Sequence, residues 1–190
     1  MGNSISVIDD FTQKIMKKLF IEVEASGRHV HLSKNELEYL SGKNYELTFV
    51  KDLSQPGQFV CKERVRLTTQ KGSIDNVVIL GPVRKETQIE LSLTDAVALG
   101  INPPVRQSGD IENTPGITIE ANGVKLIKSS GVIIAKRHIH LTPQDAEHFN
   151  VKDGENVELK VFGDRPAIFY DTVARVSNSF ATYAHIDYDE

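Results

Sequence analysis

The feature that most constrains this chain is a short pattern that occurs twice. The copies are Arg28-His29-Val30-His31-Leu32-Ser33 and Arg137-His138-Ile139-His140-Leu141-Thr142, and together they hold four of the six histidines. Alternate residues of a β-strand point to the same face, so each His-x-His pair can present two imidazoles to one point. Imidazole is the commonest metal ligand among side chains. The two pairs therefore predict one or two metal sites of the zinc class.

Each His-x-His pair lies in the same local order of elements. Residues 21–31 and 132–140 are rich in β-branched side chains and predict strands. A Ser-x-x-Glu capping box begins at Ser33, and Thr142 is followed by proline at the first helical position. The unit of strand, histidine pair, cap and short helix recurs after 109 positions. This recurrence indicates a duplication or a two-fold arrangement of similar modules.

The rest of the chain predicts a mainly β protein with short helices. Turn signals such as Gln55-Pro56-Gly57 and Thr114-Pro115-Gly116 separate short strands, a pattern typical of small barrels. Residues 93–99 predict one further helix, which ends at Gly100. Strands and helices do not alternate, and no GxGxxG or Walker motif is present. These absences argue against a Rossmann sheet.

The N-terminal region, residues 1–20, predicts an amphipathic helix. Apolar side chains recur there at three- and four-residue spacing, at Ile5, Ile8, Phe11, Ile15 and Leu19. Such a helix either packs on the body of its own chain or docks into a larger assembly. The sequence leaves both alternatives open.

The composition argues against several classes of partner. The 190 residues carry a net charge of −4 and no sustained basic run, so nucleic acid is not an expected partner. The apolar run at 131–135 is far too short to span a membrane, and residues 1–20 lack the apolar core of a secretory signal. The single cysteine, Cys61, excludes an intrachain disulfide and predicts a reducing, cytoplasmic location.

Other titratable residues are ambiguous on residue chemistry alone. His185 and Glu90 both lie in strand-like segments and are candidate metal ligands, but a packed histidine and a solvated strand face remain alternatives. Arg84 is typical of a surface arginine, and His148 of a solvated helix residue. Cys61 is expected in the core. No Ser-His-Asp order predicts a nucleophilic triad.

Further strings, in order along the chain, resemble one known family. They are Ser26-Gly27 before the first histidine pair, Lys51-Asp52-Leu53-Ser54-Gln55-Pro56-Gly57-Gln58, Leu80-Gly81-Pro82-Val83-Arg84, Gln88-Ile89-Glu90-Leu91-Ser92-Leu93-Thr94-Asp95-Ala96, Arg106-Gln107-Ser108-Gly109-Asp110 and His185-Ile186-Asp187. With both histidine motifs, they resemble the propanediol-utilisation-type phosphate propanoyltransferases. These are phosphotransacylases associated with bacterial microcompartments, and the resemblance covers nearly everything from residue 21 onward.

The resemblance implies a fold and an activity. It implies two small β-barrel domains capped by helices and preceded by the N-terminal helix at 1–20. Residues 28–135 would form the first barrel, and residues 21–27 with 136–190 the second. The implied enzyme is a zinc-dependent acyltransferase, which interconverts acyl-CoA (propanoyl-CoA or acetyl-CoA) plus phosphate with acyl phosphate plus CoA.

The resemblance also implies roles for individual residues. It implies two zinc ions between the domains, with one on His29, His31 and Glu90. The second zinc would be held by His138, His140 and His185. Phosphate would be bound by Arg84, and the substrate CoA would lie near Ala25, Ser26, Gly27 and Lys51. Family members usually continue past the position of Glu190, so part of the CoA surface is expected to be absent here.

The implied partners are small molecules and assemblies. They are acyl-CoA, CoA and phosphate, a second copy of the chain in a homodimer, and a microcompartment shell contacted through the N-terminal helix. A cytoplasmic location inside a bacterial microcompartment follows. Two alternatives keep the same ligands: a two-zinc hydrolase that activates water, or a zinc-stabilised structural module closed by a fourth protein ligand. Three protein ligands per zinc favour an open, catalytic site.

Overall fold

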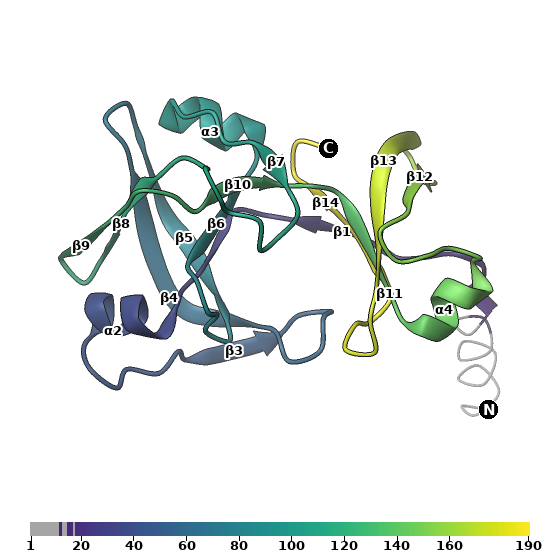
Figure 1. Ribbon diagram of the computed structural model, residues 1–190, viewed down its shortest axis with the longest axis horizontal. Helices are drawn as coiled ribbons and strands as arrows, with labels where there is room; N and C mark the ends of the chain where they lie inside the picture. The colour runs from purple at the N-terminus through teal and green to yellow at the C-terminus, as the bar shows by residue number, and fades with distance from the viewer. Residues whose placement is uncertain (1–11, 13–14, 17) are drawn as a thin grey trace, which may run out of the picture. The chain divides into compact units, whose positions relative to one another are not determined.

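The computed structural model describes residues 12, 15–16 and 18–190 (Figure 1). Most of the helix predicted within residues 1–20 therefore lies outside the described residues. The described chain is mainly β with short helices, as the sequence predicted. The helices with assigned bounds are α2 (Lys34–Ser41), α3 (Leu93–Leu99) and α4 (Pro143–His148). In the part of the chain that is described, no helix is both long and apolar enough to cross a membrane.

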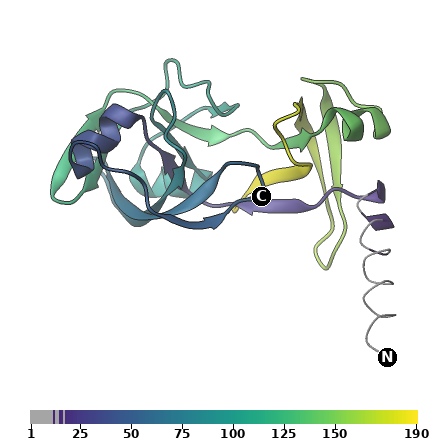
Figure 2. The ribbon, with the colours of Figure 1, turned by 90° about the horizontal axis from the view of Figure 1, so that it is seen from below.

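The strands form two sheets. The elements, in chain order, are β1 (Val23–Ser26), β2 (His29–His31), β3 (Phe49–Asp52), β4 (Phe59–Thr68), β5 (Ser73–Gly81), β6 (Gln88–Leu91), β7 (Val105–Arg106), β8 (Ile117–Ala121), β9 (Val124–Lys128), β10 (Val132–Ala135), β11 (His138–Leu141), β12 (Asn156–Val161), β13 (Ala167–Val176) and β14 (Tyr183–Asp187). The nine-stranded sheet has the order β7-β10-β6-β2-β5-β4-β8-β9, with β3 paired to β4. The five-stranded sheet has the order β1-β14-β11-β13-β12, and Figures 1 and 2 both show β1 alongside β14.

The contacts within the chain divide it into two units. The first comprises Met1–Glu24 and His138–His185, and the second comprises Ala25–Arg137 and Ile186–Glu190. We refer to them as unit 1 and unit 2. Each unit contains one of the two His-x-His strands, β11 in unit 1 and β2 in unit 2.

The two segments that lead into the His-x-His pairs are each broken into two strands, which differs from the continuous strands that the sequence predicted. Residues 21–31 form β1 and β2, and residues 132–140 form β10 and β11, and in both cases the two strands belong to different sheets. Gly27 lies in the first break, where a Cβ atom would meet the ring of Tyr188 at 2.9 Å. The breaks fall at Gly27-Arg28 and Lys136-Arg137, where no β-branched residue lies. A glycine inside a strand pattern marks a bend or bulge, so Gly27 hints at the first break, whereas nothing comparable marks the second.

The core of unit 2 is built from the alternating apolar residues of its strands. Val30, Leu67, Ile89 and Ile119 are completely buried in it. Cys61 belongs to the same cluster, which confirms the prediction of a core thiol. Burial, together with the nearby charge of Glu63, raises the pKa of this thiol to about 11.

The helices begin and end largely where the sequence predicted. In α3, Ser92 and Asp95 form a complete capping box, and Gly100 ends the helix in the left-handed conformation at φ 64°. The hydroxyl of Ser33 accepts the first-turn N–H bond of α2 at 3.4 Å, and the hydroxyl of Thr142 does the same for α4 at 3.1 Å. Both are therefore N-caps, as predicted.

The backbone N–H groups of these two N-caps donate to threonine hydroxyls, and no residue pattern predicted these partners. The N–H of Ser33 donates to the hydroxyl of Thr87 at 2.8 Å, instead of closing the predicted capping box. The N–H of Thr142 donates to the hydroxyl of Thr182 at 3.2 Å. Thr87 directly precedes β6, and Thr182 directly precedes β14. The cap that follows each histidine pair is thus tied to the strand beside it.

Replacing Thr87 tests this tie. Its side chain is 1% exposed, so Thr87→Val keeps the shape but leaves the Ser33 N–H without its acceptor. We expect the free energy of unfolding to fall by about 1–3 kcal/mol in urea denaturation. Thr87→Ser retains the hydroxyl and should lose less. A valine variant as stable as the parent chain would contradict the role of the hydrogen bond.

Candidate metal centres

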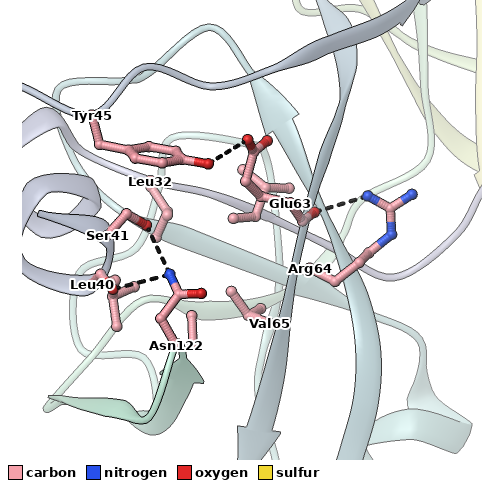
Figure 3. A pocket seen from close by; sticks show the side chains of 10 residues that line it. Leu32, Leu40, Ser41, Tyr45, Glu63, Arg64, Val65 and Asn122 are labelled. Carbon is pink, nitrogen blue, oxygen red and sulfur yellow. Dashed lines mark hydrogen bonds between the residues drawn. The ribbon is translucent and has the colours of Figure 1, made fainter.

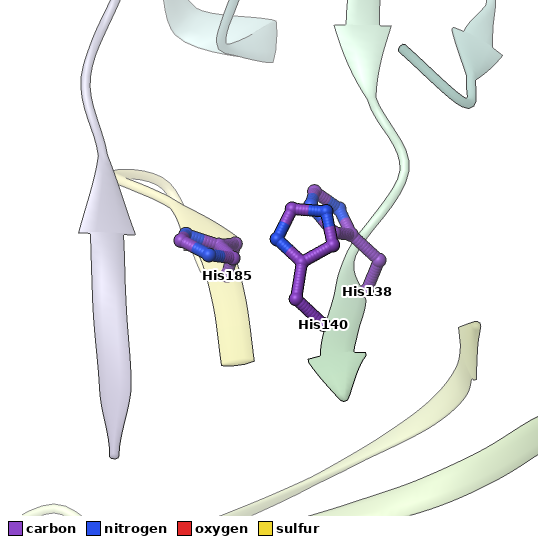
Figure 4. A group of neighbouring side chains, drawn as sticks. All are labelled: His138, His140 and His185. Carbon is purple, nitrogen blue, oxygen red and sulfur yellow. The ribbon is translucent and has the colours of Figure 1, made fainter. Parts of the chain in front are cut away.

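The six predicted metal ligands lie in two groups of three. We call His29, His31 and Glu90 the first triad, and His138, His140 and His185 the second triad. Within each triad the candidate ligand atoms lie within 4.8 Å of one another. Figure 4 shows the three rings of the second triad, carried by two neighbouring strands. The structure therefore brings together the same sets of residues that the resemblance implies.

Strand pairing explains how each third residue reaches its histidine pair. Glu90 lies opposite His29 in the antiparallel pairing of β2 with β6. His185 lies opposite His138 in the antiparallel pairing of β11 with β14. On its other side, each His-x-His strand has a parallel neighbour, β5 or β13. The two triads are therefore built by the same arrangement of strands.

Hydrogen bonds orient the rings of the first triad. Nδ1 of His29 lies 2.9 Å from the carbonyl oxygen of Gly27, so Nδ1 carries the proton and donates it. Nε2 of His29 then faces Oε2 of Glu90 at 3.5 Å. His31 forms a hydrogen bond with the backbone of Leu80, and its Nδ1 atom remains for another partner. Each side chain thus turns one ligand atom toward the other two.

The charges of the first triad suit a cation. Burial lowers the pKa of His31, and the charges of His29 and Arg84 lower it further, well below its ordinary value. Burial works to raise the pKa of Glu90, but His29, His31 and Arg84 outweigh it, and the pKa lies well below the usual range. Neutral imidazole and ionised carboxylate are the forms that bind metals.

The second triad is also arranged to keep an imidazole neutral. Burial, with the charges of His138 and His185, lowers the pKa of His140 to about 3. Its ring lies against Phe180, with 4.1 Å between the ring centroids. Nδ1 of His185 lies 3.7 Å from a carboxylate oxygen of Glu24. A carboxylate beside a ligating histidine orients the ring and raises its basicity toward a metal.

Each triad contains a buried nitrogen that lacks a hydrogen-bond partner. Within the described residues, only three buried side-chain atoms have none, and two of them are Nδ1 of His31 and Nδ1 of His140. Such an atom costs roughly 1–3 kcal/mol when it is left unsatisfied. A metal ion at each triad would give its unpaired nitrogen a partner. Zinc in proteins is commonly held by two or three histidines with at most one carboxylate. The residues of both triads therefore fit a metal ion.

The similarity between the two triads extends beyond the first repeated pattern. Arg28 pairs with Asp95 at 2.8 Å, and Arg137 pairs with Glu190 at 2.5 Å. Each of these acids lies five residues after the third member of a triad, and each capping threonine lies three residues before it. A second repeat therefore runs as Thr-x-x-ligand-x₄-acid, from Thr87 and from Thr182.

This second repeat relates Glu90 to His185 by residue pattern alone, independently of the family resemblance that implied both ligands. The repeat is hard to recognise because its copies are 95 positions apart, whereas the copies of the histidine pattern are 109 apart. No single period aligns both patterns, since the connections between them differ in length. The change of residue type, from Glu90 to His185, hides the correspondence further.

Arg84 lies beside the first triad and is half-buried, which differs from the surface position that residue chemistry alone suggested. Its backbone N–H donates to the carbonyl oxygen of Leu32 at 2.9 Å, next to the histidine strand. Its guanidinium donates to the hydroxyl of Ser108 at 3.0 Å. Its charge lowers the pKa values of His31 and Glu90. A cation therefore faces the first triad.

The residues expected near CoA lie at two places in unit 2. Ala25 and Ser26 end β1, and Gly27 follows with its carbonyl oxygen bound by His29. Lys51 is exposed on β3. His148 is the one histidine of the chain that belongs to neither triad. It lies on α4, where its Nε2 atom is 2.7 Å from the carbonyl oxygen of Lys18.

A small pocket of about 80 Å³ also lies in unit 2, and none of the triad residues lines it (Figure 3). The hydroxyl of Tyr45 donates to Glu63 at 2.9 Å. The amide of Asn122 donates to the carbonyl oxygen of Leu40 at 3.3 Å. Because these lining groups bind one another, the pocket does not indicate a ligand.

Known proteins that are similar in sequence to this chain indicate its family. A family model described as phosphate propanoyltransferase matches residues 22–190. A phosphate propanoyltransferase of Clostridioides difficile (strain 630) is 56% identical over 184 residues, which cover 97% of this chain and 88% of the relative. That of Listeria monocytogenes is 56% identical over 194 residues, with 100% of this chain and 90% of the relative covered.

A third relative gives the same result. The phosphate propanoyltransferase of Thermotoga maritima is 55% identical over 179 residues, which cover 94% of this chain and 85% of the relative. The matched segment includes both histidine pairs and every residue of the two triads. Because the family model and these relatives match nearly the whole chain, the protein belongs to the phosphate propanoyltransferase family and, as its motifs predicted, is a transferase.

Proposed function

We propose that this protein is a zinc-dependent phosphate acyltransferase, which interconverts propanoyl-CoA or acetyl-CoA plus phosphate with the acyl phosphate plus CoA. The observation that carries the proposal is the pair of matched triads, each with a buried imidazole nitrogen that lacks a hydrogen-bond partner. Membership of the phosphate propanoyltransferase family supports the substrates. The geometry of the triads supports the metal.

Each triad would hold one zinc ion. The first is held by His29, His31 and Glu90, and the second by His138, His140 and His185. When bound, zinc supplies a Lewis acid that polarises a thioester carbonyl and stabilises a thiolate. The protein's part is to keep His31 and His140 neutral and Glu90 ionised, which the burial and charges of the two sites favour.

Arg84 would bind the phosphate. Its planar guanidinium can donate two parallel hydrogen bonds to phosphate oxygens, and its position beside the first triad would orient the phosphate for attack. A phosphate oxygen attacks the acyl carbon, the carbon–sulfur bond breaks, and CoA leaves as the thiolate. No acyl-enzyme is required. Cys61 is unsuited to form one, because it is fully buried and its pKa is raised to about 11.

CoA would bind at Ala25, Ser26, Gly27 and Lys51. The exposed ammonium group of Lys51 suits the phosphate groups of CoA. Gly27 would join the CoA surface to the first triad, because its carbonyl oxygen fixes the ring of His29. Residues 28–135 would form one β-barrel domain, and residues 21–27 with 136–190 the other. A homodimer in the cytoplasm, packaged inside a microcompartment through the N-terminal helix, completes the proposal.

A thiol-release assay tests the activity. Purified protein is incubated with propanoyl-CoA or acetyl-CoA, with and without inorganic phosphate, and free CoA is measured with a thiol reagent. Phosphate-dependent release supports the transacylase. Release without phosphate would instead favour the two-zinc hydrolase, and no release would favour a zinc-stabilised structural module.

The triads predict the metal content. We expect elemental analysis of the purified protein to find about two zinc ions per chain. His29→Ala and His138→Ala should each remove about one equivalent, because each breaks a different triad. His148→Ala is the matched control and should keep both, since His148 lies outside the triads. An active protein that contains no transition metal would refute the metal proposal.

The role of Arg84 predicts a selective loss. Arg84→Ala should raise the KM for phosphate by about tenfold or more while changing the KM for acyl-CoA little, because a charged hydrogen-bond partner contributes about 1.5–3 kcal/mol. Arg84→Lys should recover only part of the loss, since lysine lacks the two-pronged donor geometry. Arg66→Ala, at an exposed arginine of the same unit, should change neither constant. Unchanged phosphate kinetics in Arg84→Ala would contradict the proposal.

The N-terminal region should be separable from the chemistry. Its described apolar residues Ile15, Met16 and Leu19 are exposed, and none of them resembles a ligand. Deleting residues 1–18 should therefore leave zinc content and turnover within about a few-fold of the parent chain, while self-association or shell binding changes. Light scattering and the thiol assay measure the two effects. A deletion that abolishes turnover or unfolds the protein would show that this region belongs to the core.

A further inference from the structure

A hydrogen-bond network joins Glu90 to Arg84 through Ser108. The hydroxyl oxygen of Ser108 lies 3.0 Å from Oε1 of Glu90, 2.8 Å from Nε2 of Gln88 and 3.0 Å from Nη1 of Arg84. Nε2 of Gln88 also lies 2.5 Å from Oε1 of Glu90. The backbone N–H of Gly109 donates to Oε1 of Gln88 at 2.7 Å. Every member of the network belongs to unit 2.

The chemistry of these groups fixes the direction of each hydrogen bond. A guanidinium can only donate, and an ionised carboxylate can only accept. The amide oxygen of Gln88 accepts from Gly109, so its nitrogen faces Ser108 and Glu90 as a donor. Ser108 therefore accepts from Arg84 and Gln88 and donates its one proton to Glu90. This uses the whole hydrogen-bonding capacity of a serine hydroxyl.

The network binds one oxygen of the Glu90 carboxylate and leaves the other oxygen facing the triad. Oε1 of Glu90 accepts from both Gln88 and Ser108. Oε2 faces Nε2 of His29 at 3.5 Å, inside the triad. A carboxylate that is held at one oxygen can present the other in a single direction, which is how hydrogen bonds behind a metal ligand tune a site. The same hydroxyl also holds the guanidinium that faces the triad.

We propose that Ser108 is a positioning residue, which orients Glu90 toward the metal and Arg84 toward phosphate at the same time. The inference rests on the proposed function and assigns a role that neither the histidine motifs nor Arg84 itself predicts. Ser108 lies in the turn after β7. It connects that turn to β6, which carries Glu90, and to Arg84 in the segment before β6. Loss of its hydroxyl should weaken zinc binding at the first triad and phosphate binding together, while the second triad is unaffected.

Zinc and phosphate affinities of the full-length protein test the proposal without any use of activity. Chelator competition is measured with Zn²⁺ in a His138→Ala background, which isolates the first triad, and in a His29→Ala background, which isolates the second. Ser108→Ala should raise the zinc dissociation constant of the first triad by about tenfold to a hundredfold. The constant of the second triad should stay unchanged. Calorimetry with inorganic phosphate should show a dissociation constant raised by about fivefold or more.

Two further variants separate the hydroxyl from general damage. Ser108→Thr keeps a hydroxyl and should retain most of both affinities. Ser73→Ala is the matched control, because it removes the exposed hydrogen bond of 2.8 Å from Arg66 to a serine hydroxyl without touching a triad. Unchanged constants in Ser108→Ala would overturn the proposal, and so would an equal loss in Ser108→Thr. A parent chain that binds no zinc would refute the metal proposal, and with it this one, before any variant is made.

Discussion

The candidate sites depend on the antiparallel register that sets Glu90 opposite His29 and His185 opposite His138. Side chains alternate between the faces of a strand, so a slip of one residue would turn the third member of each triad away from its histidines. The surrounding contacts oppose such a slip. A threonine before each third residue binds the cap after the histidine pair, and an acid five residues later binds the arginine before it. The histidine strand and its antiparallel neighbour are thus joined at both ends.

This arrangement concentrates buried polar groups that are costly unless something satisfies them. Burial favours the neutral forms of His31 and His140, nearby positive charges favour the ionised form of Glu90, and each triad leaves one imidazole nitrogen without a partner. A cation at each triad would remove that cost, so metal binding would stabilise the fold as well as supply chemistry. The network behind Glu90 avoids the same cost by itself, because the hydroxyl of Ser108 uses its donor and both of its acceptor sites. Rigid, satisfied surroundings hold the ligand atoms in place.

Much of the local structure followed from the sequence. The two histidine patterns, the N-caps at Ser33 and Thr142, and the helix that ends at Gly100 each depend on neighbours within a few residues, and the structure confirms them. The family resemblance, which the comparisons confirm, also rested on short strings. The breaks inside residues 21–31 and 132–140 were not predicted in this way, because a two-residue interruption such as Gly27-Arg28 or Lys136-Arg137 does not tell which sheet the next strand joins.

The sequence by itself therefore determined that two pairs of imidazoles share a strand face, because that follows from the two-residue period of a β-strand. Only the tertiary structure decided which third residue meets each pair, since Glu90 and His185 arrive from strands that are 59 and 45 residues away along the chain from His31 and His140. It also placed Arg84 beside the first triad, through the hydroxyl of Ser108. Such contacts depend on strand register and on the closure of long connections, and neither is encoded in any local stretch of residues.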